Sequence, residues 1–281
     1  MSGRAESENV SPTAYATGAF WYRHGLSHKG LLLPQSARAG RSFSVLRGLV
    51  RLFGGGSFTA LMLARHKGID AVLARAIDAG KVGQVVELAA GLSPRGWRFT
   101  QKYGDRIEYV ETDLPKMVAL KERLLAKSKL HGPRHRVVAV NALSDSGPDS
   151  LAALAATLDP GKGLAIVTEG LMSYLDPDAA RGVWQRIAEV LKRFPHGVYL
   201  SDMYLRRDRH GLGALLFRAA IQRAVRGRMF VHFETPDEAV AKLTAAGFAS
   251  VTLHEPRTIP ETRELGETRG GDRVRVLEAT V

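Results

Sequence analysis

Polar side chains follow five apolar runs of this sequence, and their types suit ligand binding rather than packing. Because the carboxyl ends of parallel strands meet at one edge of a sheet, we expect these side chains to lie close together. The edge would repel a phosphate, whereas it would bind a nucleoside with hydroxyls, an amino group and a positive charge. In chain order the polar side chains are Glu87, then Glu111 and Asp113, then Asn141, then Glu169, and last Ser201 and Asp202.

The loop after the first run, "VVELAAGLSPRGWRF" at 85–99, contains Gly91, which permits close approach of a ligand to the backbone. Pro94 predicts the start of the following helix. The loop lacks the G-x-G-x-x-G pattern of dinucleotide sites, and G-K-[ST] of phosphate loops occurs nowhere in the chain. The sequence therefore favours a single nucleoside over a pyrophosphate ligand.

The strand-end residues divide by their chemistry. Asp113 lies about 20 residues past the glycine loop, where an acidic residue commonly accepts hydrogen bonds from ribose hydroxyls. Asn141 can donate to and accept from an adenine edge, and Glu87 and Glu169 can attract an ammonium or a sulfonium. S-adenosylmethionine carries all of these groups.

Short β-branched runs alternate with longer helical ones after residue 80, which predicts an α/β fold with a doubly wound, mostly parallel sheet of seven strands. No helical repeat separates the last two strands, so we expect a terminal antiparallel hairpin. The predicted strands are 84–88, 107–112, 136–140, 164–168, 197–203, 250–255 and 273–280. The predicted helices are 58–80, 95–103, 115–130, 149–158, 177–194 and 236–246.

Residues 1–57 lack a clear hydrophobic repeat, and we expect them to form an N-terminal helical cap or lid. The glycines 54–56 would join this segment to a main domain at 58–281. The segment 204–232 predicts a basic amphipathic helical insertion.

Composition narrows the class of protein. The chain of 281 residues has no cysteine, which excludes disulfides, thiolate zinc sites and a cysteine nucleophile, and no metal site is expected. The polar start and the lack of an apolar run of about 18 residues predict a cytoplasmic protein without a membrane span. Net charge is +12, spread along the chain, which favours an anionic small acceptor over nucleic acid.

Three stretches resemble the leucine carboxyl methyltransferase family: "QVVELAAGLSPRGWRF", "YVETDLPKMVALKERLL" and "IVTEGLMSYLDPD". That family includes the protein phosphatase methyltransferases and bacterial O-methyltransferases of polyketide biosynthesis. The resemblance runs from about residue 58 to about residue 203. It implies the class I methyltransferase (Rossmann-like) fold and S-adenosylmethionine as cofactor, with S-adenosylhomocysteine as product.

The resemblance also implies roles for individual residues. Arg65 resembles the arginine that holds the methionine carboxylate of the cofactor, and Tyr174 the tyrosine at the substrate mouth. The other cofactor-binding residues, from the resemblance and from the strand ends, are Glu87, Leu88, Gly91, Asp113, Leu114, Asn141, Ala142 and Glu169.

The chain departs from the family pattern at three places. The family loop G-L-D-T-R reads Gly91-Leu92-Ser93-Pro94-Arg95, and Asn141 replaces an aspartate that faces the adenine. Thr13 stands where phosphatase-type members have lysine, which argues against a phosphatase substrate.

These observations predict an O-methyltransferase that acts on a small-molecule carboxylate or hydroxyl, such as a polyketide-type metabolite. A carboxylate needs no base and would be held by cations, for which Tyr22-Arg23 and Arg206 are candidates. A hydroxyl would gain from a histidine base. The catalytic residue, the acceptor and the oligomeric state stay open, as do a non-catalytic cofactor-binding scaffold and an RNA methyltransferase. The histidines that could reach the acceptor are His24, His66, His210 and His232, each more simply a surface or structural residue.

Overall fold

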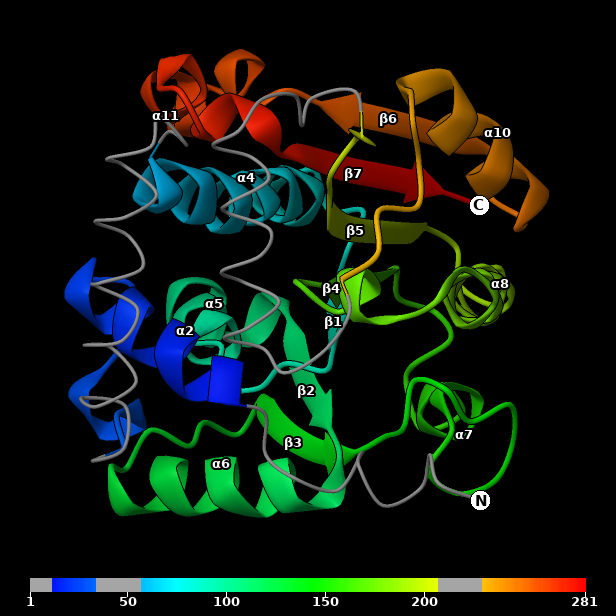
Figure 1. Ribbon diagram of the computed structural model, residues 1–281. Helices are drawn as coiled ribbons and strands as arrows, with labels where there is room; N and C mark the ends of the chain where they lie inside the picture. Colours follow the sequence, from blue (N-terminus) through cyan, green and yellow to red (C-terminus); the bar gives the residue numbers. More distant parts are fainter. Residues whose placement is uncertain (1–11, 34–56, 207–228) are drawn as a thin grey trace, which may run out of the picture.

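The computed structural model describes residues 12–33, 57–206 and 229–281 (Figure 1). One seven-stranded sheet has the order β3-β2-β1-β4-β5-β7-β6, with β7 antiparallel to both of its neighbours and the other pairs parallel. The predicted α/β sheet with a terminal antiparallel pair is therefore confirmed. The strands are β1 Gln84–Leu88, β2 Glu108–Asp113, β3 His135–Ala139, β4 Leu164–Thr168, β5 Gly197–Met203, β6 Ser250–His254 and β7 Arg275–Thr280.

Helices cover both faces of the sheet (Figure 1). The α-helices are α2 Pro12–Arg23, α4 Phe58–Asp78, α5 Arg95–Tyr103, α6 Pro115–Lys127, α7 Leu151–Ala155, α8 Pro177–Leu191, α10 Pro236–Ala245 and α11 Arg263–Glu267. The 3-10 helices are η1 Lys29–Leu31, η2 Gly104–Arg106, η3 Met172–Tyr174, η5 Pro256–Thr258, η6 Pro260–Thr262 and η7 Gly271–Arg273.

The central strands β1, β4 and β5 are buried on both faces because neighbouring side chains enter different cores. Val85 of β1 packs in a cluster with residues of α4 and α5, whereas Val86 packs in a larger cluster with residues of α7, α8 and α10. These opposed cores explain why the neighbouring residues Val85 and Val86 of β1 are both apolar.

Local chemistry determines where α4 begins and ends. The Ser57 hydroxyl accepts a hydrogen bond from the N–H of Ala60 and caps the first turn. Gly80, with φ +71°, follows the C-cap residue Ala79, as expected for a glycine stop. The helix presents Arg65, His66 and Asp70 toward the sheet edge.

The connection between β6 and β7 differs from the prediction, since it contains α11 and three 3-10 turns. Elements of three to five residues are too short to show a helical repeat, so the hydrophobic pattern could not reveal them.

Helix α2 packs against α4. Phe20 and Trp21 of α2 form a buried cluster with Phe58 and Leu61 of α4. A helix is thus present in the predicted N-terminal cap, while the domain division at residue 57 stays a prediction. The glycine joint, His210 and residues 207–228 of the basic segment lie outside the described residues.

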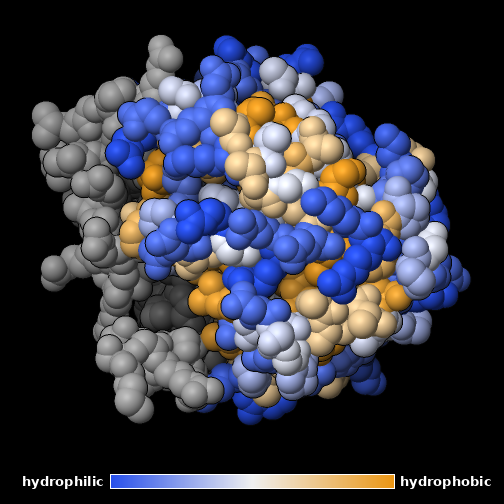
Figure 2. All heavy atoms as spheres, turned by 90° about the vertical axis from the view of Figure 1, so that its right-hand side faces the viewer, coloured by the Kyte–Doolittle hydropathy of each residue, from blue (hydrophilic) through white to orange (hydrophobic). Residues whose placement is uncertain are grey.

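The face that carries α7, α8 and α10 interleaves hydrophilic and apolar residues (Figure 2). This is the surface that amphipathic helices produce when one side of each packs on the sheet. Of the helices in the described ranges, none combines the length and apolarity that crossing a membrane requires.

Candidate functional site

The loop after β1 is held at the carboxyl edge of the sheet by Asp113, the last residue of β2. Gly91 N–H donates to Asp113 Oδ2 at 2.8 Å, and Leu114 N–H donates to Oδ1 at 2.8 Å. Gly91 has φ +53°, a conformation that favours glycine. A carboxylate has about four acceptor positions, so Asp113 retains acceptor capacity for a ligand. Burial raises the pKa of Asp113, against the effect of the two backbone donors.

Arg65 of α4 lies at the ends of β4 and β5. Its Nε donates to Glu169 Oε1 at 2.9 Å, and its Nη1 is 3.6 Å from Asp202 Oδ2. Burial opposes the charge, but Glu169, Tyr204 and Asp202 outweigh it and raise the pKa of Arg65. Arg65 is therefore a permanent cation at this edge.

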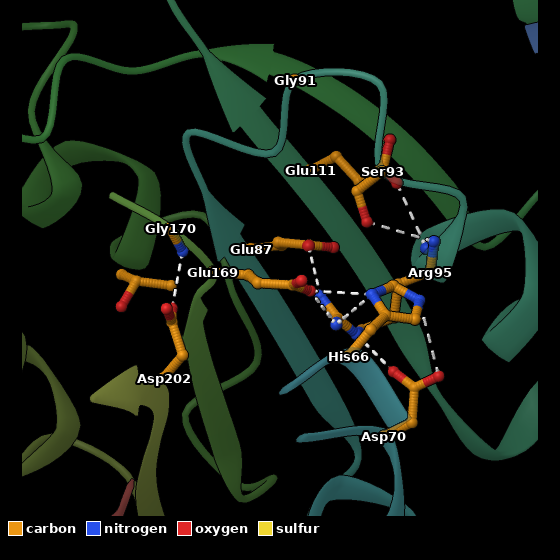
Figure 3. Close-up of polar contacts among 12 residues, drawn as sticks. His66, Asp70, Glu87, Gly91, Ser93, Arg95, Glu111, Glu169, Gly170 and Asp202 are labelled. Atoms are coloured by element: carbon orange, nitrogen blue, oxygen red, sulfur yellow. Dashed lines mark hydrogen bonds and ion pairs between the residues drawn. The ribbon is translucent and has the colours of Figure 1, made fainter. Parts of the chain in front are cut away.

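Gly170 lies beside that guanidinium, and its N–H donates to Asp202 Oδ1 at 2.6 Å. Its φ is +76°, and a Cβ on Gly170 would lie 3.5 Å from Arg65 Nη1. The positive φ favours glycine here, and the contact between Gly170 and Asp202 is visible in Figure 3.

Arg95, the first residue of α5, is fully buried among three carboxylates (Figure 3). Its Nε is 2.6 Å from Asp70 Oδ1, its Nη1 is 2.5 Å from Glu87 Oε1, and its Nη2 contacts Glu169 Oε2. These contacts join α4, the end of β1 and the loop after β4. The carboxylates that the sequence assigned to a cationic ligand are thus already paired with a cation of the chain.

His66 is also buried in this cluster. Its Nδ1 lies 2.8 Å from Glu169 Oε2, and the Trp21 ring of α2 stacks on it with centroids 4.2 Å apart. Burial opposes the charge of Glu169, but His66, Arg65 and Arg95 hold its pKa well below the usual range. Among the candidate bases, His66 is a buried residue of α4 rather than a lid residue.

A second buried cluster lies beneath the Ser93-Pro94 turn. Glu111 Oε2 lies 2.6 Å from Lys121 Nζ and 3.2 Å from His135 Nε2, and Glu111 Oε1 accepts from Gly96 N–H at 3.1 Å. Lys121 Nζ also donates to the Ser93 carbonyl at 2.8 Å. Burial opposes the charge of Glu111, but Lys121 and His135 lower its pKa to about 2.

The remaining predicted cofactor residues lie along the same edge. Glu87 is buried and accepts from the Tyr109 hydroxyl at 2.7 Å, and Leu88 is buried beside it. The Asn141 side-chain oxygen accepts from Leu143 N–H at 3.0 Å, and Ala142 follows it, partly exposed.

The predicted acceptor residues lie at the surface. Tyr22 and Tyr174 are 42% and 40% exposed, and Arg23 is exposed at the end of α2. Arg206 Nε lies 3.5 Å from Glu234 Oε2, and both side chains are mostly exposed.

Sequence reasoning missed the partners Trp21, Asp70, Arg95 and Lys121. One clue was available: His66 and Asp70 are four residues apart on a predicted helix, so their side chains lie on the same face of that helix. Arg95 had no comparable clue, because its partners come from three separate segments.

We predict that Arg95→Met lowers the free energy of unfolding by about 3–5 kcal/mol, because three buried carboxylates lose their shared cation. Urea unfolding measures the change. The control is Arg106→Met, which removes an exposed ion pair with Asp78 at 3.3 Å and should cost about 0–1 kcal/mol. Equal losses in both variants would contradict the importance of the Arg95 cluster.

The low pKa of Glu111 predicts that the stability of the folded protein falls in acid. Its pKa of about 2 in the folded protein lies below the usual 4.5, so its contribution to stability is complete above pH 4.5 and is lost as pH falls toward 2. Urea unfolding across this range should show a shallower pH dependence for Glu111→Gln than for the parent protein. An unchanged slope would refute the assignment.

Comparison with known proteins agrees with the motifs. The family model for leucine carboxyl methyltransferase matches residues 53–188. A protein of Rhodococcus jostii, named as a candidate S-adenosyl-L-methionine-dependent methyltransferase, is 36% identical over 143 residues, which are 50% of this chain and 46% of that protein. The chain thus spans about half the length of the curated relatives it matches.

Solved structures support the fold. A DUF574 family protein from Streptomyces avermitilis has a TM-score of 0.65 and 16% identity, covering 98% of this chain and 99% of that one. An O-methyltransferase family protein from Burkholderia thailandensis has a TM-score of 0.53 and 17% identity, covering 79% and 57%. At these identities the likeness establishes the class I methyltransferase fold alone. The resemblance predicted from the motifs is confirmed, because residues 53–188 of this chain match the leucine carboxyl methyltransferase family.

Proposed function

We propose that this protein is an S-adenosylmethionine-dependent O-methyltransferase with a small-molecule acceptor. The observation that carries the proposal is the convergence of Arg65, Gly91 and Asp113 at the carboxyl edge of the sheet. Open α/β sheets bind ligands at this edge. The family match and the names of the relatives support the same activity.

The donor and acceptor set fits the cofactor. Asp113 has acceptor capacity left for the ribose hydroxyls, and the Arg65 guanidinium, with five N–H donors, can hold the methionine carboxylate. Gly170 keeps the space beside Arg65 free of a side chain. Asn141, partly exposed after β3, is available to the adenine.

Glu169 has a second role besides the one that its position alone suggested. Since Arg65, Arg95 and His66 already surround its carboxylate, we assign it to orienting Arg65 in addition to attracting the cofactor's amine. Glu87 is buried and contacts Arg95, so we assign it to positioning Arg95 rather than to contact with the cofactor.

When bound, the cofactor would supply a methyl group on a sulfonium, and an oxygen nucleophile would attack that methyl carbon in line with the carbon–sulfur bond. The protein's main task is alignment of the nucleophile with the methyl group, which can lower the barrier by about 7–11 kcal/mol.

We predict that Asp113→Asn weakens binding of S-adenosylhomocysteine by about tenfold or more, or about 1.4 kcal/mol. The amide removes the negative charge and one of the acceptors that hold Gly91 and the ribose. Isothermal calorimetry measures the affinity, and Asp105→Asn is the control because Asp105 is 95% exposed beside Arg134.

An unchanged affinity in a folded Asp113→Asn protein would contradict the proposed site. Cofactor binding without formation of S-adenosylhomocysteine on any acceptor would favour a non-catalytic scaffold instead.

A further inference from the structure

A small cavity of about 20 Å³ lies where β4 and β5 end, beside the proposed cofactor site. This volume is about that of one water molecule. Asp202 lines the cavity and also contacts Arg65 and Gly170, so the cavity adjoins the residues assigned to the methionine part of the cofactor. The lining includes Met172, Asp202, Trp184, Phe230, His232 and Phe233.

His232 lines this cavity and has one ring nitrogen that its hydrogen bond to the backbone leaves available. Its Nε2 lies 2.7 Å from the Met172 carbonyl oxygen, and because a carbonyl accepts only, Nε2 carries the hydrogen. Nδ1 is buried and has no hydrogen-bond partner among the residues that the structure describes. Burial lowers the pKa of His232, so the ring is neutral near pH 7 and Nδ1 has a free lone pair.

The cavity lining favours a particular acceptor. Trp184 and Phe233 stack with centroids 5.3 Å apart, and the His232 ring meets Trp184 edge to face at 5.4 Å. No arginine or lysine lines the cavity within the described ranges, and Asp202 would repel a carboxylate. An aromatic hydroxyl therefore fits this lining better than the carboxylate that Arg206 was expected to hold.

We propose that His232 is the general base of this enzyme and that the acceptor is an aromatic hydroxyl. This inference rests on the proposed methyltransferase function. The hydroxyl proton passes to His232 Nδ1, and the oxygen forms a bond to the methyl carbon. The carbon–sulfur bond breaks and its electron pair stays on sulfur, which yields the aryl methyl ether, S-adenosylhomocysteine and an imidazolium that then releases its proton to water.

A phenol ring is larger than the cavity, so binding requires part of the lining to move. Phe230 and Val231 lie outside helices and strands and are partly exposed, whereas His232 is held by the Met172 carbonyl, so Phe230 and Val231 are the part best able to shift outward. One backbone contact, Phe230 N–H to the Ser173 carbonyl at 2.9 Å, ties this segment to the loop after β4.

The experiment compares the parent protein with His232→Gln, whose amide can still donate to the Met172 carbonyl. The probes are 4-methylphenol, which is protonated at neutral pH, 4-nitrophenol, which is ionised at mildly alkaline pH, and benzoate. We expect methylation of 4-methylphenol by the parent and a fall of about 10²–10⁴-fold in kcat for the variant. With ionised 4-nitrophenol, which needs no base, the loss should be much smaller.

The matched control is His254→Gln. His254 of β6 pairs with Glu278 of β7 at 2.7 Å, away from the cavity, and its loss should leave both phenol rates unchanged.

The pH profile provides a second readout. The parent rate on 4-methylphenol should fall as pH drops through the pKa of His232, and this limb should be absent in His232→Gln. The charged and titratable groups around the ring are Lys242, which lowers its pKa, Asp176, which raises it, and Asp202 and Tyr204 of the cavity lining.

Three results would overturn the proposal: equal losses on both phenols, methylation of benzoate without methylation of phenols, or methylation of no probe by protein that binds S-adenosylmethionine. Failure of the proposed function itself is a separate result, in which calorimetry detects no cofactor binding.

Discussion

The buried guanidinium of Arg95 is the interaction on which the candidate site depends. Asp70, Glu87 and Glu169 come from a helix, a strand and a loop, and burying three carboxylates together without a cation would be prohibitive. With Arg95 between them, α4 is attached to the ends of β1 and β4. That attachment places Arg65, five residues before Asp70 on the same helix, beside Asp202 at the end of β5.

The same pairing changes how the site can recognise a ligand. Five strand ends with acidic or amide groups suggested an edge that attracts positive charge. In the folded protein Arg65, Arg95 and His66 surround Glu169, while Lys121 and His135 contact Glu111. Recognition must then depend on hydrogen-bond geometry, as at Asp113, and on the open backbone at Gly91 and Gly170, more than on net charge.

The elements were predictable because their sequence patterns are local. β1, β4 and β5 have the bounds expected from their apolar runs, and α5 has those expected from its helical segment. The contacts of Arg95 with Asp70 and of His66 with Glu169 were not predictable, since a buried ion pair leaves no local pattern when its partners are 25 and 103 residues apart. His232 could be named as a candidate, but its tautomer and its free nitrogen depend on the carbonyl of Met172, 60 residues earlier.

The Ser93-Pro94 turn, where the chain departs from the leucine carboxyl methyltransferase pattern, shows how such long-range contacts can accompany a changed side chain. The turn is held partly through its backbone: the Ser93 carbonyl accepts from Lys121, and Gly96 N–H donates to Glu111. A Cβ on Gly96 would lie 2.5 Å from Glu111 Oε1, so glycine is required for this approach. These two contacts do not depend on the side chain at position 93, and the Ser93 hydroxyl accepts from Arg95 N–H at 3.3 Å, so serine still provides an oxygen acceptor at the start of α5. Pro94 supports the same geometry, since it serves as the N-cap residue from which α5 begins and Arg95 enters the carboxylate cluster.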